Sequence, residues 1–338
     1  MWPRLPIGKL DLDLLRRLLA DYQREDPRVI LGPTIGEDVA VIEMGRTCLV
    51  AKTDPITFAT DEIGWYAVQV NANDVATSGA VPRWFMATIL LPDNSATEGL
   101  AEDIFKQIAD ACEGLDVTLV GGHTEVTYDL QRPIIVGTML GEVAREHLIC
   151  TAGAQIGDQI LLTKGVALEG TAILAREKPD FLRQLGRGED EIRALRDLLR
   201  DPGISVVRDA QIACEAGHVH AMHDPTEGGV ATGLWELALA ADIGLRIDGA
   251  ELDEMNPHGQ IWRELDIDPL GVIGSGALLI TAADSHARAI RWKLVEAGIR
   301  CRIIGRATAA SDGLILDTPQ GPVELPRYDQ DEITKLFS

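Results

Sequence analysis

The stretch from Thr53 to Pro82 constrains this chain more than any other part of its sequence. It places acidic residues on either side of an apolar run, with Asp54 near its beginning and Asn73-Asp74 near its end. Carboxylates at the ends of strands and helices, beside apolar scaffolding, are typical of sites that hold a metal and a phosphorylated ligand. The stretch therefore predicts such a site, and other motifs are needed to complete it.

Three further motifs have a composition that suits a site for a metal and a phosphorylated ligand. They are Gly36-Glu37-Asp38-Val39-Ala40, Gly121-Gly122-His123-Thr124-Glu125 and Asp224-Pro225-Thr226-Glu227-Gly228-Gly229. Taken singly, each acidic residue is more often a turn residue or a helix cap than a ligand. Two like charges about 4 Å apart, however, repel by roughly 4 kcal/mol at an effective dielectric constant near 20. If folding brings Asp38, Asp54 and Asp74 together, a cation must accompany them, and their hard oxygen ligands suit Mg²⁺.

Residue periodicity predicts strands and helices in the first half of the chain. Short strands at 39–42 and 48–51, joined by a turn, would place Asp38 just before the first strand and Asp54 just after the second. In a hairpin those two ends are neighbours. Helical spacing predicts further elements at 10–22, 63–78 and 96–113, and apolar runs predict strands at 84–91, 117–120 and 134–140.

A boundary near residues 151–158 divides the chain into a domain at 1–150 and a second domain at 151–338. Both are of ordinary size for a globular domain. The second half is predicted to contain strands at 159–163, 277–280 and 301–304, helices from 171, at 209–216 and at 285–297, and a charged, solvated helical insertion at 178–201. This order of elements predicts an α+β fold.

Both glycine-rich turns indicate phosphate binding, and the turn at 224–229 is the more specific indication. Gly121-Gly122 follow a short strand that is predicted to be buried, and glycines there let the backbone approach a phosphate or another strand. In the second turn Asp224 or Thr226 can cap the following helix, while Gly228-Gly229 expose its first N–H groups to an anion. A plain capped helix is the alternative. His123 and His223 could lie near the ligand, although a lone histidine is more often only hydrogen-bonded.

The charge balance and the cysteines narrow the class of protein. With 53 acidic and 31 basic residues the net charge is -22, which argues against a nucleic-acid or anionic-membrane surface. No apolar run approaches the roughly 20 residues that cross a bilayer, and no signal peptide is evident. The five cysteines form no CxxC pair, which is typical of reduced thiols in a cytoplasmic protein.

The motifs, in this order, resemble the AIR synthase–like superfamily. Its members include aminoimidazole ribonucleotide synthetase, thiamine-monophosphate kinase, selenophosphate synthetase and the hydrogenase maturation factor HypE. Residues 70–76, 79–82 and 157–158 also match, and the turn at 224–229 together with 157–170 looks closest to HypE. The resemblance implies an N-terminal mixed sheet that pairs with that of a second subunit to form a barrel, and a C-terminal α+β sandwich that lines the other wall of a cleft.

The resemblance also implies ATP and Mg²⁺ in that cleft and phosphoryl transfer to an oxygen acceptor, which in HypE is of the amide type. Metal ligands would be Asp38, Asp54, Asp74 and Glu125. Catalytic residues would be Asp224, Glu227 and His123, of which Asp224 and Glu227 would face the acceptor. The nucleotide wall would be formed by Thr53, Asn73, Gly121, Gly122, Thr124, Gly228 and Gly229.

Two departures from the family pattern leave the function open. His123 stands where many relatives have an acidic residue, so Glu125 could substitute or one metal site could be lost. HypE carries its substrate on a C-terminal cysteine, whereas the last cysteine here is Cys301, so a complete chain would not dehydrate a thiocarboxamide in the usual way. Three functions are expected as alternatives: a homodimeric HypE-like enzyme acting on a small molecule, a thiamine-monophosphate-type kinase, and a non-catalytic nucleotide-binding partner in hydrogenase or metalloenzyme maturation.

Overall fold

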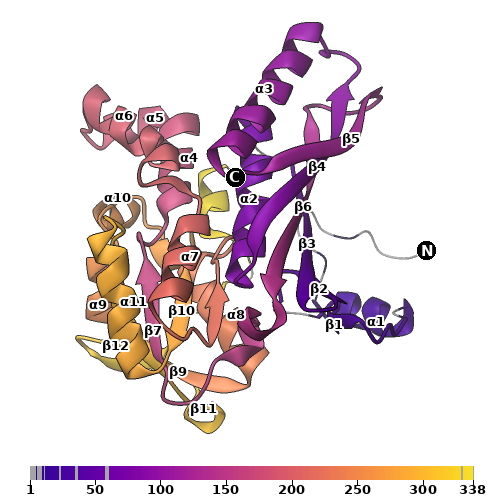
Figure 1. The fold of residues 1–338 in the computed structure, drawn as a ribbon. Coiled ribbons are helices and arrows are strands. Elements are labelled where there is room, and N and C mark those ends of the chain that lie inside the picture. The colour runs from indigo at the N-terminus through magenta and orange to yellow at the C-terminus, as the bar shows by residue number, and fades with distance from the viewer. Residues whose placement is uncertain are drawn as a thin grey trace.

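The computed structural model describes residues 5, 10, 12–22, 24–34, 37–57, 61–328 and 330–337, and the chain folds into two α+β domains with one sheet each (Figure 1). The strands of the first sheet are β1 (Val29–Leu31), β2 (Ala40–Met44), β3 (Thr47–Ile56), β4 (Val81–Pro92), β5 (Thr118–Thr127) and β6 (Ile134–Ala144). Their spatial order is β1-β2-β3-β6-β4-β5. All neighbours are antiparallel except β4 and β5, so the sheet is mixed.

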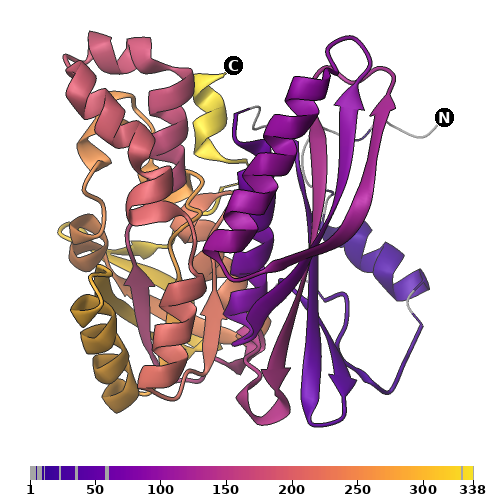
Figure 2. The same cartoon turned by 45° about the horizontal axis from the view of Figure 1, so that its top comes forward.

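Helices α2 (Ile63–Thr77) and α3 (Glu98–Gly114) cover the side of the first sheet that faces the second domain (Figure 2). Every residue of α2 except Val70 is buried, which fits a helix with apolar residues all round. In α3 only one stripe is buried, including Ile104 and Ile108, so this helix is amphipathic. The third helix, α1 (Leu12–Tyr22), lies beside β1 and β2.

The second domain has a seven-stranded sheet in the order β13-β12-β9-β11-β7-β10-β8. Its strands are β7 (Gln159–Thr163), β8 (Ala221–His223), β9 (Ile243–Asp248), β10 (Leu279–Ala282), β11 (Cys301–Ala309), β12 (Leu314–Thr318) and β13 (Gly321–Glu324). Its helices are α4 (Leu168–Glu177), α5 (Pro179–Gln184), α6 (Glu189–Asp197), α7 (Val207–Ala216), α8 (Gly229–Ala241), α9 (Gly249–Glu254), α10 (Gly259–Glu264) and α11 (Asp284–Glu296).

One hydrophobic core is shared by the two domains. It joins residues of α2 and the first sheet, such as Val68 and Phe85, to residues of the second domain, such as Ala210 of α7 and Ile290 of α11. A second core fills the opposite side of the second sheet and includes Leu234 of α8. Because the shared core is apolar and continuous, burial of this surface holds the domains together.

Many of the predicted elements are confirmed, and others need correction. The helix predicted at 63–78 is α2, and the strand predicted at 159–163 is β7. The insertion at 178–201 is not simply solvated, since α6 buries Ile192 and Leu195. Strands β9, β12 and β13 were not predicted. Among the described residues, no helix combines the length and apolar character that a membrane span requires.

The prediction of a short buried strand before Gly121-Gly122 is wrong. Strand β5 continues through both glycines to Thr127 and is exposed along almost its whole length. Gly122 pairs with Ala87 of β4 and has φ +152°, and a Cβ atom there would lie 2.1 Å from the Ala87 carbonyl oxygen. The glycine therefore allows two strands to approach closely and does not form a turn.

Candidate functional site

Three aspartates from both domains converge at one point of the domain interface. Asp38 precedes β2, Asp74 lies in the last turn of α2, and Asp224 follows β8. Each offers a carboxylate oxygen within 4.8 Å of the other two. Asp74 and Asp224 are buried and Asp38 is partly buried. The expected meeting of Asp38 with Asp74 is thus present, and Asp224, which was expected to face the acceptor, completes this aspartate triad.

The triad is short of hydrogen-bond donors. Among the described residues, none donates a hydrogen bond to Asp74 Oδ2 or to either carboxylate oxygen of Asp224. Burial raises the pKa of Asp224 to about 7, to which the Asp38 carboxylate contributes, and burial also raises the pKa of Asp74. Buried carboxylates are costly unless their charge is balanced, and a hard divalent cation suits three converging carboxylate oxygens. The donor set therefore fits Mg²⁺.

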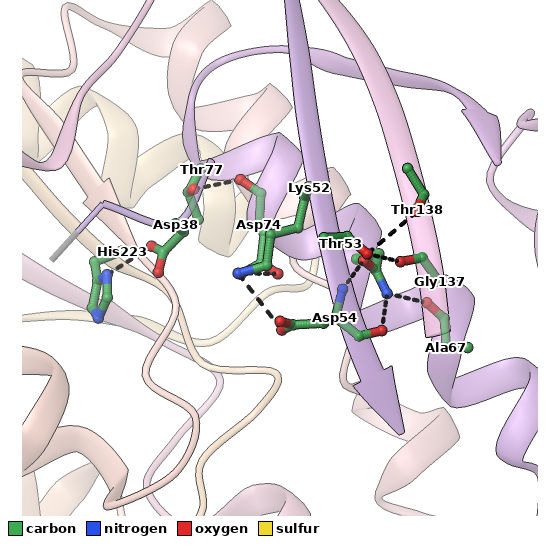
Figure 3. A network of polar contacts seen from close by, with 11 residues as sticks. Asp38, Lys52, Thr53, Asp54, Ala67, Asp74, Thr77, Gly137, Thr138 and His223 are labelled. Carbon is green, nitrogen blue, oxygen red and sulfur yellow. Dashed lines mark hydrogen bonds and ion pairs between the residues drawn. The ribbon is translucent and has the colours of Figure 1, made fainter. Parts of the chain in front are cut away.

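Asp54 lies outside the triad, because its carboxylate is engaged by a lysine. Lys52 Nζ lies 3.6 Å from Asp54 Oδ2 and 3.3 Å from Asp74 Oδ2 (Figure 3). Burial alone would lower the pKa of Lys52, but Asp74 and Asp54 raise it above its ordinary value. The sequence predicted that Asp54 follows the strand, but Asp54 lies within β3. Sequence reasoning missed Lys52, although its i, i+2 spacing from Asp54 places both on one face of a strand.

A buried histidine links the triad to the second domain. His223 Nδ1 lies 3.0 Å from Asp38 Oδ2, and its Nε2 lies 2.9 Å from Glu236 Oε2 of α8. Burial alone would lower the pKa of His223, but the two carboxylates raise it well above its ordinary value. The imidazole therefore fixes the orientation of Asp38 from across the domain boundary.

Asn73 holds the domains together, whereas the sequence had suggested a nucleotide contact. Its Nδ2 donates to the Ile204 carbonyl oxygen at 2.8 Å, and its Oδ1 accepts from the Val206 N–H at 2.8 Å. Glu37 makes a similar link, accepting from the N–H groups of Thr151 and Ala152 at 3.2 Å each. Because both polar atoms of Asn73 bond to backbone, the amide aligns Asp74 with the second domain.

The hydroxyl of Thr53 joins two strands of the first sheet. It donates to the Gly137 carbonyl oxygen of β6 at 2.8 Å and accepts from the Thr138 hydroxyl at 3.3 Å. Asn71 supports the same region, because its Oδ1 accepts from the Asp54 N–H at 2.8 Å. These bonds fix β3 where it carries Lys52 and Asp54.

Within a single chain, the five residues of the motif at 121–125 lie away from the aspartate triad. They belong to β5, which is separated from β3 by β6 and β4, roughly 14 Å across the sheet at about 4.8 Å per strand. His123 Nε2 and Glu125 Oε2 lie 3.1 Å apart on the exposed strand. A single chain therefore does not bring His123, Glu125, Gly121, Gly122 or Thr124 to the proposed metal position.

The turn at 224–229 leads into helix α8. The side chain that bonds to the N-terminal end of this helix comes from a distant part of the chain. The N-cap residue is Gly228, and the Gly228 N–H donates to Asp331 Oδ2 at 2.7 Å, so the prediction that Asp224 or Thr226 caps the helix is wrong. Gly229 has φ +67°, and a Cβ atom there would lie 2.5 Å from the Leu270 carbonyl oxygen. Glu227 is exposed at the tip of the turn.

Glu169, in the first turn of α4, is a buried acid whose role the sequence did not reveal. Burial raises its pKa to about 7, while hydrogen bonds from Ser275 lower it and the Asp331 carboxylate raises it further. Within the part of the chain that the structure describes, no donor reaches its Oε2 atom. The only sequence signal is an acidic residue followed by glycine at the start of a predicted helix, which is weak.

Comparison with known families accounts for both domains. The model for the AIR synthase related protein N-terminal domain matches residues 36–143, and that for the C-terminal domain matches residues 155–317. The chain belongs to the AIR synthase related family. The carbamoyl dehydratase HypE of Cupriavidus necator is 30% identical over 264 residues, which cover 75% of this chain and 71% of that protein. A Methanocaldococcus jannaschii protein named for hydrogenase expression and formation is 29% identical over 303 residues, covering 87% and 86%.

Solved structures of HypE and ThiL proteins share the fold. A HypE chain from a HypE–HypF complex superposes with a TM-score of 0.71 at 19% identity, covering 94% of this chain and 100% of that one. HypE in complex with ATP gives a TM-score of 0.69 at 22% identity, covering 94% and 96%. A ThiL protein complexed with AMPPCP and TMP gives 0.69 at 19% identity, covering 90% and 92%. At these identities the likeness concerns the fold alone.

Proposed function

We propose that this protein is an ATP- and Mg²⁺-dependent enzyme of HypE type that phosphorylates an amide- or carbonyl-type oxygen of a small molecule. The observation that carries the proposal is the convergence of Asp38, Asp74 and Asp224 from two domains. Among the described residues, buried oxygens of Asp74 and Asp224 accept no hydrogen bond. Structural ion pairs do not need such an arrangement, whereas a site for metal-bound phosphates does. The relatives named for carbamoyl dehydration and the fold neighbour bound to ATP support the same function.

Each residue of the site has a definite task in this proposal. Asp38, Asp74 and Asp224 would hold Mg²⁺, which when bound supplies charge neutralisation at the transferred phosphoryl group. His223 orients Asp38, and Asn73 keeps Asp74 in register with the second domain. Removing water from a carbamoyl group requires its oxygen to become a leaving group, and phosphorylation of that oxygen achieves this. Asp224, which borders both domains, and the neighbouring Glu227 would face the acceptor.

Two measurements test the proposal together: nucleotide binding, and ATP turnover with different acceptors. Calorimetric titration with AMPPCP is expected to show binding that requires Mg²⁺, and ADP release from ATP is expected to rise with carbamoyl or thiocarboxamide compounds. ADP release that rises with thiamine monophosphate instead would identify the kinase alternative. Nucleotide binding without turnover on either acceptor, together with a stable complex with a maturation factor, would identify a non-catalytic partner. The structure of HypE with HypF supports a maturation-factor protein as the partner to test.

We also propose that the protein is a homodimer that pairs through β5. This strand is the edge of the first sheet, the exposed fractions of its Val120 and Val126 are 51% and 59%, and that of Tyr128, just after the strand, is 81%. An exposed apolar edge with free N–H and C=O groups favours pairing with another strand. A second copy seated there would cover it and complete the barrel that the family resemblance implies.

The double substitution Val120→Lys with Val126→Lys is expected to convert the dimer to a monomer, because it places like charges on both copies of a buried strand pair. Light scattering after size-exclusion chromatography measures the mass. We expect the dissociation constant to rise at least tenfold. Val295→Lys is the matched control, since Val295 is an exposed valine of α11 in the second domain. A wild-type mass equal to one chain at all concentrations would contradict the dimer.

A further inference from the structure

We propose that the ammonium group of Lys52 serves as the second cation of this site, so that a single divalent ion held by Asp38, Asp74 and Asp224 completes it. The inference rests on the proposed function, because that function assigns the divalent ion to the triad. The inference goes beyond that function because it gives the number of divalent ions that this chain requires. It also identifies Lys52 as the residue that sets this number.

The position of Lys52 is built into the fold. Lys52 and Asp54 lie on one face of β3, and α2 packs Asp74 against that face. Hydrogen bonds from Thr53 to β6 and from the Asp54 N–H to Asn71 hold the strand in place. The lysine side chain is only 17% exposed, so its ammonium group does not sample solvent as a surface lysine does.

The contacts of Lys52 divide the acidic residues into two sets. Its Nζ lies 3.3 Å from Asp74 and 3.6 Å from Asp54, between the two carboxylates (Figure 3). Asp54 does not join the triad, so it has the lysine as its cation. Asp74 belongs to both sets and connects them. A second divalent ion between Asp54 and Asp74 would have to displace a fixed positive charge, which like-charge repulsion opposes.

A plain structural ion pair is the alternative explanation, and it makes a different prediction. If Lys52 only stabilises β3 and α2, its removal destabilises the chain and leaves the number of bound ions unchanged. If Lys52 stands in for a cation, its removal leaves Asp54 and Asp74 as a vacant pair of oxygen ligands. A divalent ion can then enter where the ammonium group was.

Mn²⁺ titration without nucleotide separates the two explanations. Bound ions are counted by calorimetry and by the electron paramagnetic resonance signal of free Mn²⁺. We expect one ion per chain for the wild type and two for Lys52→Met, which keeps the length of the side chain and removes its charge. Lys106→Met, at an exposed lysine of α3, is the matched control and should bind one ion. Two ions in the wild type, or one ion in Lys52→Met, would overturn the inference.

One further variant and a stability measurement guard against misfolding and against loss of the whole site. The double variant Lys52→Met with Asp54→Asn removes both charges of one pair and should return to one ion, because the second ion needs Asp54. Lys52→Met should unfold at a lower temperature than the wild type without metal, and Mn²⁺ should raise that temperature more than it does for the wild type. A wild type that binds no Mn²⁺ would overturn the triad assignment itself. One ion in both wild type and Lys52→Met overturns the role of Lys52 alone.

Discussion

The substitution Asp224→Asn is expected to reduce Mg²⁺-dependent ATP turnover about 100- to 1000-fold, because it removes a charged ligand from a site that acts mainly by electrostatic stabilisation. The same substitution is expected to raise the unfolding temperature of the metal-free protein by a few degrees at pH 8. Burial and the Asp38 carboxylate raise the pKa of Asp224 to about 7, so at pH 8 the folded chain must hold an ionised, donor-free carboxylate. A neutral amide avoids that cost.

These opposite effects distinguish a binding site from a structural cluster. Turnover is measured as ADP release with saturating Mg²⁺, and stability by differential scanning fluorimetry with EDTA and with Mg²⁺. The wild type should gain stability on adding Mg²⁺, and the variant should gain little. Asp190→Asn, at an exposed residue of α6, is the control and should change neither quantity. Loss of stability in Asp224→Asn with and without metal would mean that the carboxylate has a structural role only.

Local sequence was sufficient to find the acids of the site, because they stand at the ends of elements with clear periodicity. Asp38 precedes a strand, Asp74 lies in the last turn of an apolar helix, and Asp224 opens a proline-containing turn. What local sequence does not contain is which of them meet. Asp54 has the same character as the others, yet it lies outside the triad, with its carboxylate 3.6 Å from Lys52 on the same face of β3.

The remaining differences between expectation and structure concern partners that are distant in the chain. Asn73 was expected to contact nucleotide, but its amide bonds to residues 204 and 206. The cap of α8 comes from Asp331, about a hundred residues away. Gly121-Gly122 have the composition of a phosphate loop, but the second glycine is required by the close approach of Ala87. Composition alone does not separate these causes, since glycine serves a tight turn and a close strand contact equally well.

Glu169→Gln is expected to change how stability depends on pH. The pKa of Glu169 is raised from 4.5 to about 7 by burial, so the folded chain keeps the proton over a range in which the unfolded chain loses it. Below about pH 4.5 both states are protonated and the residue has no effect. As the pH rises from about 4.5 to 7, the free energy of unfolding should fall by roughly 3 kcal/mol, and above pH 7 the loss stays constant.

The glutamine variant has no such titration and can still accept a hydrogen bond from Ser275. Its free energy of unfolding should therefore equal that of the wild type near pH 4 and exceed it by roughly 2–3 kcal/mol at pH 8. Urea titrations at pH 4, 6 and 8 give the difference, and Glu102→Gln, at an exposed residue of α3, is the control. A difference that is the same at all three pH values would mean that Glu169 has the same pKa in the folded and the unfolded chain. Because subtraction of the wild-type profile cancels the titration of the aspartate triad, a rise confined to pH 4.5–7 belongs to Glu169.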